Sequence, residues 1–520
     1  MVKSPPPRRA LAAPPRAPAV AQKPAAPHPF GTAAATEAPP PWVVDADALY
    51  REATAHAGAG RLQQAVDAFD RLLRLKPEHA DALNDRGNAL DLLRRRAEAL
   101  DSYERALRIR PDHIHALNGR ANMLQAFGRL DEALDGYAAA IAIDARYVHA
   151  WNGRGNTLLA LGRHRDALAD YLHAQQLRPD LPDPHFNEAL VRLTLGEFEA
   201  GWRKHEWRWS LPFWRPRLRG FTQPAWLGES DPRGRVLLLH AEQGFGDTLQ
   251  FCRYVPLVAA TGARVVLEVQ PALRTLLGQL PGVETLVARG DALPPFDAHC
   301  PLLSLPLAMG TRVFSIPPPL PRLQADPERA AAWAARLGPR RGLRVGVAWQ
   351  GNTGHDNDRN RSIPLARFTA LLAPACADAP PVEFVSLHPQ VPPRDRDLLP
   401  ALPALRDVGD GLNDFADTAA LVAHLDLVIA VDTSVAHLAA AMGRPTWILL
   451  PHPADWRWML DRDDSPWYPA VRLFRQTHAG DWDAVLARVR AALAPLASGV
   501  AGASATAGVA DDAGAGDAGA

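Results

Sequence analysis

Residues of three kinds recur every 34 positions through the first third of the chain. The small residues of this series are Ala65, Ala99, Ala133 and Ala167. Aromatic residues keep the same phase at Phe69, Tyr103, Tyr137 and Tyr171. Prolines follow at Pro77, Pro111 and Pro179, with Ala145 in the remaining place. Small residues let two helices approach, aromatic side chains fill the space to the next unit, and proline ends a helix. The period predicts a solenoid of stacked helical hairpins.

This pattern resembles the tetratricopeptide repeat. We expect four repeats, at residues 45–79, 80–113, 114–147 and 148–181, followed by a degenerate fifth that caps the stack. Solenoids of this kind offer a concave groove that suits an extended peptide or another protein. The resemblance therefore implies a protein or peptide partner, and a purely structural spacer is the alternative.

Charge and cysteine content limit the classes of ligand. Lysine plus arginine and aspartate plus glutamate both number 57, so no overall charge favours a nucleic-acid partner. Cys252, Cys300 and Cys376 are widely separated, which fits a reducing compartment and argues against a disulfide framework or a cysteine-rich zinc site. Tryptophans and arginines alternate in residues 202–221. Such a stretch can stack on nucleic acid, but we favour a junction that seats the solenoid on the next domain.

Both ends of the chain have the composition of disordered tails. Residues 1–44 are proline-rich and mildly basic, without the continuous apolar run of a signal peptide. Residues 498–520 are rich in glycine, alanine and aspartate. No run reaches the roughly 20 apolar residues of a membrane span. We expect no transmembrane segment and a cytoplasmic location.

From residue 235 the pattern changes to alternating strands and helices. The predicted strands are 236–240, 264–269, 343–349, 382–387, 427–431 and 446–450, and a proline-rich stretch, 294–321, interrupts the series. Strand–helix alternation predicts parallel sheets covered by helices. The predicted fold class is an α-solenoid (45–215) followed by two Rossmann-like α/β domains (216–335 and 336–497).

The loop after the first predicted strand, HAEQGFGDTLQF at residues 240–251, is glycine-rich. It differs from a dinucleotide-binding turn because Leu249 replaces the third glycine and because no acid follows about 20 residues on. Glu268 is the acid closest to that position. The missing glycine and acid together disfavour an NAD-dependent enzyme. Asp247 stands at the helix start, where it would repel a phosphate, and an ordinary helix-capping aspartate would look the same.

Two later loops carry residues that suit an anion. In residues 425–443 a predicted strand ends at Asp432, and Thr433 and Ser434 open a helix whose N-terminus can bind phosphate. His437 follows one turn later, either facing the same anion or buried as a core histidine. The second loop, AWQGNTGHDNDRNRSIPL at residues 348–365, contributes Gln350, Asn352, Arg359, Arg361 and Ser362. Its run 355–358 has the residue types of metal ligands at adjacent positions rather than at metal-binding spacing, so we predict no metal site.

The order of these motifs resembles glycosyltransferase family 9, the heptosyltransferase-like enzymes. The stretch DWRWMLDRDDSPWYPAVRLFRQ, residues 455–476, is similar to their tetratricopeptide-fused bacterial branch. The resemblance implies a GT-B fold, in which two Rossmann-like domains face across a cleft and the second holds the nucleotide-sugar. It implies Asp247 as the base that accepts the proton of an acceptor hydroxyl, with Glu242 in reserve. A lysine common in that family near the start of the second domain is absent, because residues 343–362 contain only arginines as basic residues.

The resemblance also implies a function. We expect an inverting, metal-independent glycosyltransferase of hexosyl or heptosyl type, without a cofactor, whose repeats recruit an acceptor such as a protein. The residues expected to contact the nucleotide-sugar are Gln350, Asn352, Arg359, Arg361, Ser362, Asp432, Thr433, Ser434 and His437. The alternative is a tetratricopeptide adaptor whose transferase domain is non-catalytic. The two differ in whether the purified protein hydrolyses a nucleotide-sugar.

Overall fold

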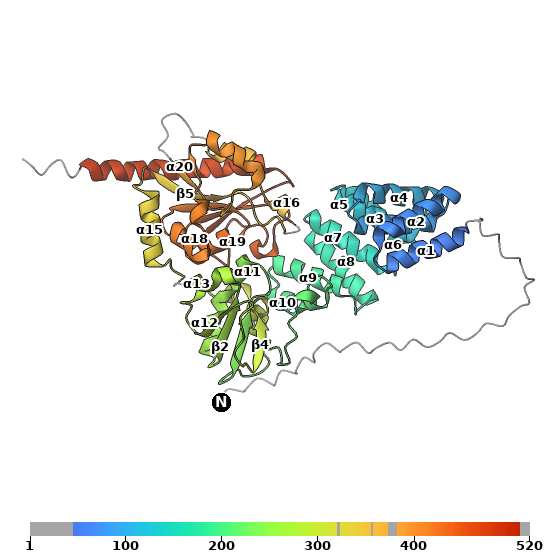
Figure 1. Ribbon diagram of the computed structural model, residues 1–520, viewed down its shortest axis with the longest axis horizontal. Helices are drawn as coiled ribbons and strands as arrows, with labels where there is room; N and C mark the ends of the chain where they lie inside the picture. The colour runs from blue at the N-terminus through green and yellow to red at the C-terminus, as the bar shows by residue number, and fades with distance from the viewer. Residues whose placement is uncertain (1–44, 320–322, 355–356, 373–381, 510–520) are drawn as a thin grey trace, which may run out of the picture. The chain divides into compact units, whose positions relative to one another are not determined.

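The computed structural model describes residues 45–319, 323–354, 357–372 and 382–509, with the backbone alone for 499–509 (Figure 1). The chain forms two compact units that divide after Ala145. The predicted tail 1–44 lies outside the described residues, as do Cys376 and residues 510–520 of the predicted C-terminal tail. Within the described ranges, no helix is both long enough and apolar enough to cross a membrane.

The described part of the first unit, residues 45–145, forms three antiparallel helix pairs. Its helices are α1 (Ala46–Gly58), α2 (Leu62–Leu75), α3 (Ala80–Leu92), α4 (Arg96–Ile109), α5 (Ile114–Ala126) and α6 (Leu130–Ile143). The buried ring of Tyr103 packs against glycines of two repeats, Gly87 and Gly119. A Cβ placed on Gly87 would lie 2.6 Å from an atom of this ring, and one placed on Gly119 would lie 2.5 Å from it. Both distances are shorter than the contacts that real Cβ atoms make. Glycine at both positions therefore lets one aromatic ring join consecutive repeats.

The second unit begins with the fourth repeat, formed by α7 (Val148–Ala160) and α8 (His164–Leu177). The degenerate fifth pair, α9 (Pro182–Thr194) and α10 (Phe198–His205), follows it. Glu188 of α9 is buried and accepts hydrogen bonds from Gln175 of α8 (2.7 Å) and Arg192 (2.6 Å). The structural division thus falls after the third repeat, whereas the sequence pattern placed a domain boundary after residue 215.

The tryptophan- and arginine-rich segment 202–221 joins α10 to the α/β part of this unit. Trp202 is buried, and its ring meets Trp456 edge-on at a centroid distance of 5.2 Å. Arg208 is also buried and donates to Glu206 and Ser304, each at 2.6 Å. Residues 202–208 therefore form the expected junction. Farther along the segment, Phe213 is 59% exposed. Only part of residues 202–221 is therefore buried in the junction.

Ten strands form two parallel sheets in the described part of the chain. The first sheet has the order β3-β2-β1-β4, from β1 (Val236–His240), β2 (Arg264–Val269), β3 (Val283–Ala288) and β4 (Ala298–Pro301). The second has the order β10-β9-β8-β5-β6-β7, from β5 (Leu343–Ala348), β6 (Val382–Ser386), β7 (Leu405–Arg406), β8 (Leu427–Val431), β9 (Thr446–Leu450) and β10 (Val471–Arg475). Every residue of β5, β8 and β9 is buried, as expected for parallel strands covered on both faces.

Short helices cover both sheets. They are α11 (Phe245–Phe251), α12 (Val255–Ala260), α13 (Arg274–Leu277), α14 (Leu305–Ala308), α15 (Pro327–Leu337), α16 (Asp358–Arg361), α17 (Leu365–Leu372), α18 (Phe415–Val422) and α19 (Ser434–Ala441). The last helix, α20 (Trp482–Val509), runs past Ser498, so helical structure continues beyond the position where the composition predicted a disordered tail. Residues 510–520 lie outside the described part of the chain.

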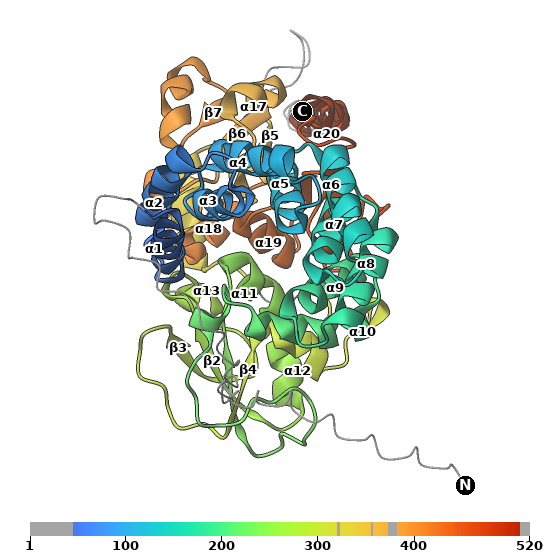
Figure 2. The same cartoon turned by 90° about the vertical axis from the view of Figure 1, so that its right-hand side faces the viewer.

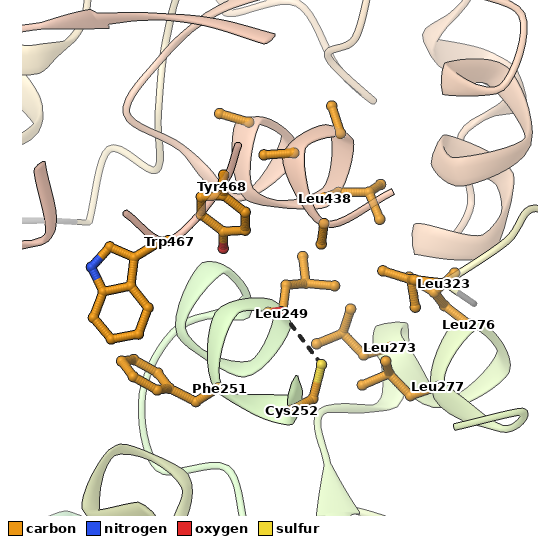
Figure 3. Close-up of a cluster of buried hydrophobic side chains, with 14 of the residues drawn as sticks. Leu249, Phe251, Cys252, Leu273, Leu276, Leu277, Leu323, Leu438, Trp467 and Tyr468 are labelled. Carbon is orange, nitrogen blue, oxygen red and sulfur yellow. Dashed lines mark hydrogen bonds between the residues drawn. The ribbon is translucent and has the colours of Figure 1, made fainter. Parts of the chain in front are cut away.

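Two of these helices bring the two sheets together. Helices α11 and α19 lie side by side between the sheets (Figure 2). Leu249 of α11 points toward α19, and Leu438 of α19 belongs to the same buried cluster (Figure 3). Both leucines are essentially inaccessible to solvent, and burying such a side chain contributes about 1.5–3 kcal/mol. The N-termini of two helices that follow β1 and β8 are therefore held near each other by apolar packing.

Candidate active site

A cavity of about 320 Å³ lies where the loop after β1 meets the loop after β8. Ligands of open parallel sheets bind at this place, beyond the carboxyl ends of the strands. Its lining residues are Gln243, Gly244, Phe245, Gly246, Asp247, Gln270, Asn352, Asn357, Arg361, Asp432, Thr433, Ser434, His437, Pro451, Asp455 and Arg457. The cavity thus collects residues from all three loops that the sequence analysis singled out.

Asp247 lies in the first turn of α11. Its Oδ2 accepts a hydrogen bond from the backbone N–H of Gly244 (2.9 Å), so it does cap the helix. Its Oδ1 accepts from the guanidinium of Arg457, and 19% of the side chain stays exposed. Capping uses one carboxylate oxygen, and the other oxygen and the exposed edge belong to the cavity wall. A role as helix cap and a role in the site are therefore compatible.

Arg457 is the main residue that the sequence analysis missed. It follows β9 in a short 3₁₀ helix (Trp456–Trp458) and is only 10% exposed. Its Nε donates to Gln250 (2.9 Å) and its Nη1 to Asp455 (2.9 Å). Burial alone would lower its pKa, but the carboxylates of Asp455 and Asp247 outweigh burial and raise it. A permanent positive charge is thus fixed in the cavity wall.

Asp432 and His437 also line the cavity. Trp458 donates its indole N–H to Asp432 Oδ2 (2.9 Å), and His437 Nε2 lies 3.7 Å from Asp432 Oδ1. His437 Nδ1 lies 3.0 Å from the hydroxyl of Tyr468, which fixes the ring. Burial would raise the pKa of Asp432, but His437, Trp458 and Arg457 together lower it. Asp432 is therefore an ionised carboxylate, and His437 is buried although it lines the cavity.

Gly246 shows how closely the two domains approach. A Cβ on Gly246 would lie 2.8 Å from Cδ2 of the His437 ring. Real Cβ atoms do not come so near, and the ring is held by its contacts with Tyr468 and Trp458. Glycine at 246 therefore permits this contact of α11 with α19.

Arg361 and the start of α19 form the cationic side of the cavity. Arg361 donates to the backbone carbonyl of Asp432 (3.0 Å) and to that of Asn352 (3.4 Å). Its Nε also contacts Asp358 at 3.3 Å, which leaves two of the five guanidinium N–H donors free of these bonds. Thr433 is the N-cap residue of α19, where backbone N–H groups have no intrahelical acceptor. These donors suit an anion.

Glu242, the reserve base, does not line the cavity. Its carboxylate is buried and accepts from the backbone N–H groups of Leu302 (3.1 Å) and Leu303 (3.2 Å). Arg208 Nη2 lies 3.5 Å from its Oε1. Burial raises the pKa of Glu242 to about 7, although Arg208 acts in the opposite direction. These contacts describe a carboxyl that ties the loop after β4 to the end of β1.

Three residues predicted to contact the nucleotide-sugar lie outside this cavity. Gln350 is buried and accepts from Arg394 (2.7 Å). Ser362 is also buried, and its hydroxyl donates to Asp358 (2.8 Å). Arg359 lines a separate cavity on the other side of α16. The structure therefore brings Asp247, Asn352, Arg361, Asp432, Thr433, Ser434 and His437 together and separates the rest from them.

The candidate metal run 355–358 is only partly visible, since His355 and Asp356 lie outside the described residues. Among the residues that the structure does describe, no three His, Cys, Asp or Glu side chains are grouped as metal ligands. Asp358, the described acid of that run, bonds to Ser362 and Arg361.

Comparisons with known proteins agree with this architecture. The tetratricopeptide repeat family matches residues 50–114 and 116–182, and glycosyltransferase family 9 (heptosyltransferase) matches residues 411–449. Protein FlbA of Caulobacter vibrioides is 30% identical over 347 residues, which cover 61% of this chain and 56% of FlbA. The chain thus aligns with little more than half the length of that relative. It combines tetratricopeptide repeats with an α/β region in which residues 411–449 are similar to family 9, as the sequence motifs predicted.

Solved structures of repeat proteins are also similar. The crystal structure of MamA is 16% identical, with a TM-score of 0.28, and covers 32% of this chain and 95% of its own. A tetratricopeptide protein of Thermus thermophilus, TTC0263, is 19% identical, with a TM-score of 0.29, and covers 32% of this chain and 92% of its own.

Proposed function

We propose that the chain is an inverting, metal-independent glycosyltransferase that moves a sugar from a nucleotide-sugar to an acceptor hydroxyl. One observation carries the proposal. The cavity between α11 and α19 has a carboxylate, Asp247, on one wall and the N-terminus of α19 with Arg361 on another. A displacement at an anomeric carbon needs both, because a proton must leave the nucleophile while a diphosphate departs.

The donor's diphosphate is proposed to bind at the start of α19. Thr433 and Ser434 present hydroxyl and backbone N–H donors there, and the helix dipole favours an anion at this end. Arg361 adds a fixed cation, and the carbonyl of Asp432 holds its guanidinium in place. Gly351 makes this possible, because a Cβ there would lie 2.5 Å from Arg361 Nη2. Fixed donors of this kind can stabilise a leaving group without a metal ion.

Asp247 is proposed as the base. The acceptor O–H gives its proton to the carboxylate of Asp247 while the acceptor oxygen forms a bond to the anomeric carbon. The bond from that carbon to the diphosphate oxygen breaks, and the nucleoside diphosphate leaves with the electron pair. Attack opposite to the leaving group inverts the configuration. The hydrogen bond from Arg457 orients the carboxylate of Asp247 toward the reaction.

The acceptor is proposed to be a protein or peptide recruited by the repeats. The support is the repeat pattern itself, since tetratricopeptide solenoids present a groove for an extended partner. The second-domain loop has arginines where heptosyltransferases have a lysine. The sugar and the nucleobase of the donor are therefore to be identified by screening nucleotide-sugars.

The experiment combines a ligand screen with a variant. Purified protein is incubated with a panel of nucleotide-sugars in EDTA, and release of the nucleoside diphosphate is measured. We expect hydrolysis of one donor, and its loss in Asp247→Asn with donor affinity nearly kept. Asp112→Asn, which changes an exposed aspartate of the first unit, is the control and should behave like the native protein. No hydrolysis or transfer with any donor would favour an adaptor, and strict dependence on a divalent ion would contradict the metal-free mechanism.

A further inference from the structure

A second cavity, of about 350 Å³, lies on the far side of α16 from the candidate active site. Three arginines line it: Arg359, Arg367 and Arg394. Its buried floor includes Ser362, Gln476 and Trp482. Helix α16 separates the two cavities and supplies an arginine to each, Arg361 to the first and Arg359 to the second.

The charge in this second cavity is only partly compensated. Among the described residues, Arg359 has no hydrogen bond or ion pair. Arg394 donates to Gln350 (2.7 Å) and has its nearest carboxylate, Asp395, at 3.7 Å. Arg367 donates to the carbonyl of Gly480 (3.3 Å) and has Asp483 at 3.6 Å. Because each guanidinium has five N–H donors, most of the donors of these three side chains are available to a ligand.

The acidic residue in the lining does not neutralise them. Asp358 is the carboxylate of this wall, and its Oδ1 already accepts from Ser362 (2.8 Å) and Arg361 (3.3 Å). The floor is fixed by Gln476, whose Oε1 accepts from the backbone N–H groups of His452 and Gly480, both at 3.1 Å. Its Nε2 is buried and has no hydrogen-bond partner among the described residues. The cavity therefore has a rigid floor and an excess of donors.

We propose that this second cavity binds an oxyanion, a carboxylate or phosphate group, that is distinct from the diphosphate proposed for the first cavity. Planar guanidinium groups match the oxygens of both chemistries. Arg359 is the ligand of this oxyanion rather than of the donor's leaving group. Because α16 supplies an arginine to each cavity, an occupied second cavity also fixes the helix that holds Arg361.

Crystals of the full chain soaked in selenate test the site directly. We expect an anomalous selenium peak in the second cavity, from a selenate whose oxygens lie within hydrogen-bond distance of Arg359 and Arg394. The peak should vanish in Arg359→Ala and in Arg359→Gln, which keeps much of the length of the side chain, and it should remain in Arg361→Ala. Anomalous density confined to the first cavity, or density in the second cavity that survives both Arg359 changes, would overturn the proposal. This outcome does not depend on whether the chain transfers a sugar.

Titration calorimetry with inorganic phosphate and with acetate then separates the two chemistries. Tighter phosphate binding indicates a phosphoryl group, and tighter acetate binding indicates a carboxylate. In either case Arg359→Ala should weaken binding at this site at least tenfold. If neither anion distinguishes the native protein from Arg359→Ala, the cavity is not an oxyanion site.

Discussion

Arg457 and Asp247 are 210 residues apart in the chain, yet the guanidinium of one donates to the carboxylate of the other. The pair links the segment after β9 in the second sheet to the start of α11 beside the first. Asp455 and Gln250 hold the same guanidinium, so the arginine is fixed from both domains. Together with the packing of Leu249 near α19, this contact sets the relative position of the proposed base and the proposed phosphate site.

Arg457→Gln should destabilise the protein by about 3 kcal/mol, because it leaves two carboxylates facing a weakly solvated wall without their cation. Urea unfolding measures the change. The matched control is Arg462→Gln, since its partner Asp464 is 66% exposed and the pair should contribute at most about 1 kcal/mol. Equal effects of the two changes would mean that Arg457 has no special structural role.

Asp247→Asn should reduce sugar transfer by a factor of about 10²–10⁴, the usual contribution of a positioned general base. The amide oxygen can still accept from Gly244, so the helix cap survives and donor affinity should change little. Steady-state kinetics with the donor found by screening separates kcat from KM. A normal rate in this variant would leave Asp247 as a cap alone.

Glu242 gives a dependence of stability on pH. Its pKa rises from 4.5 in the unfolded chain to about 7 in the folded protein, mainly through burial. The folded state therefore holds a proton that the unfolded state releases, and the resulting stabilisation is complete below pH 4.5 and is lost as pH rises through 7. Relative to Glu242→Gln, the native protein should lose about 3 kcal/mol between about pH 4.5 and 7.

Urea unfolding of the native protein and of Glu242→Gln between pH 4.5 and 7 measures how their difference in unfolding free energy changes with pH. The exposed Glu229→Gln variant should show no such slope relative to the native protein. A constant difference between native protein and Glu242→Gln at every pH would show that folding does not raise the pKa of Glu242.

Arg361→Ala should weaken binding of a nucleoside diphosphate at least tenfold while binding of the bare nucleoside changes little, because a charge-assisted bond to phosphate contributes about 1.5–3 kcal/mol. Arg359→Ala, two residues away, should change nucleoside diphosphate binding less than about threefold, a difference below about 1 kcal/mol. Calorimetric titration of both variants measures this. Similar losses for Arg359→Ala and Arg361→Ala would place both arginines at one site.

Removing residues 1–145 should leave a folded protein that binds and slowly hydrolyses its donor, because the second unit keeps the fourth repeat with α9 and α10. Transfer to the natural acceptor should fall through a higher acceptor KM. Removing residues 1–181 is the comparison, and it should yield a less stable protein because Glu188 loses Gln175. Full transfer activity after removal of residues 1–145 would show that the first three repeats are not needed to recognise the acceptor.

Local patterns were sufficient to predict most elements of the fold. Strands 236–240, 264–269, 427–431 and 446–450 match β1, β2, β8 and β9. The prediction missed β4, which lies in the proline-rich stretch, because its four residues become a strand by pairing with β1. It also missed β3 and β7, and it missed β10, which lies in the stretch 455–476 that was interpreted as a family motif.

The site was predicted less completely, for reasons of geometry. Arg359 and Arg361 are two residues apart on α16, and side chains at that spacing do not share a helix face. Glu242 could not be assigned from sequence because its partners, the amides of Leu302 and Leu303, come from the loop after β4. Arg457 gave no local signal, since its role depends on a carboxylate in the other domain.

A crystal structure of the full chain with a bound nucleoside diphosphate tests the central proposal most directly. UDP, GDP, ADP and CDP are first compared by the rise in Tm that each produces, since a true ligand stabilises the folded state. The diphosphate of the strongest ligand should lie at the start of α19, within hydrogen-bond distance of Ser434 and Arg361, with Asp247 across the cavity from it. A nucleotide bound elsewhere, or no rise in Tm with any of these nucleotides, would contradict the proposed donor site.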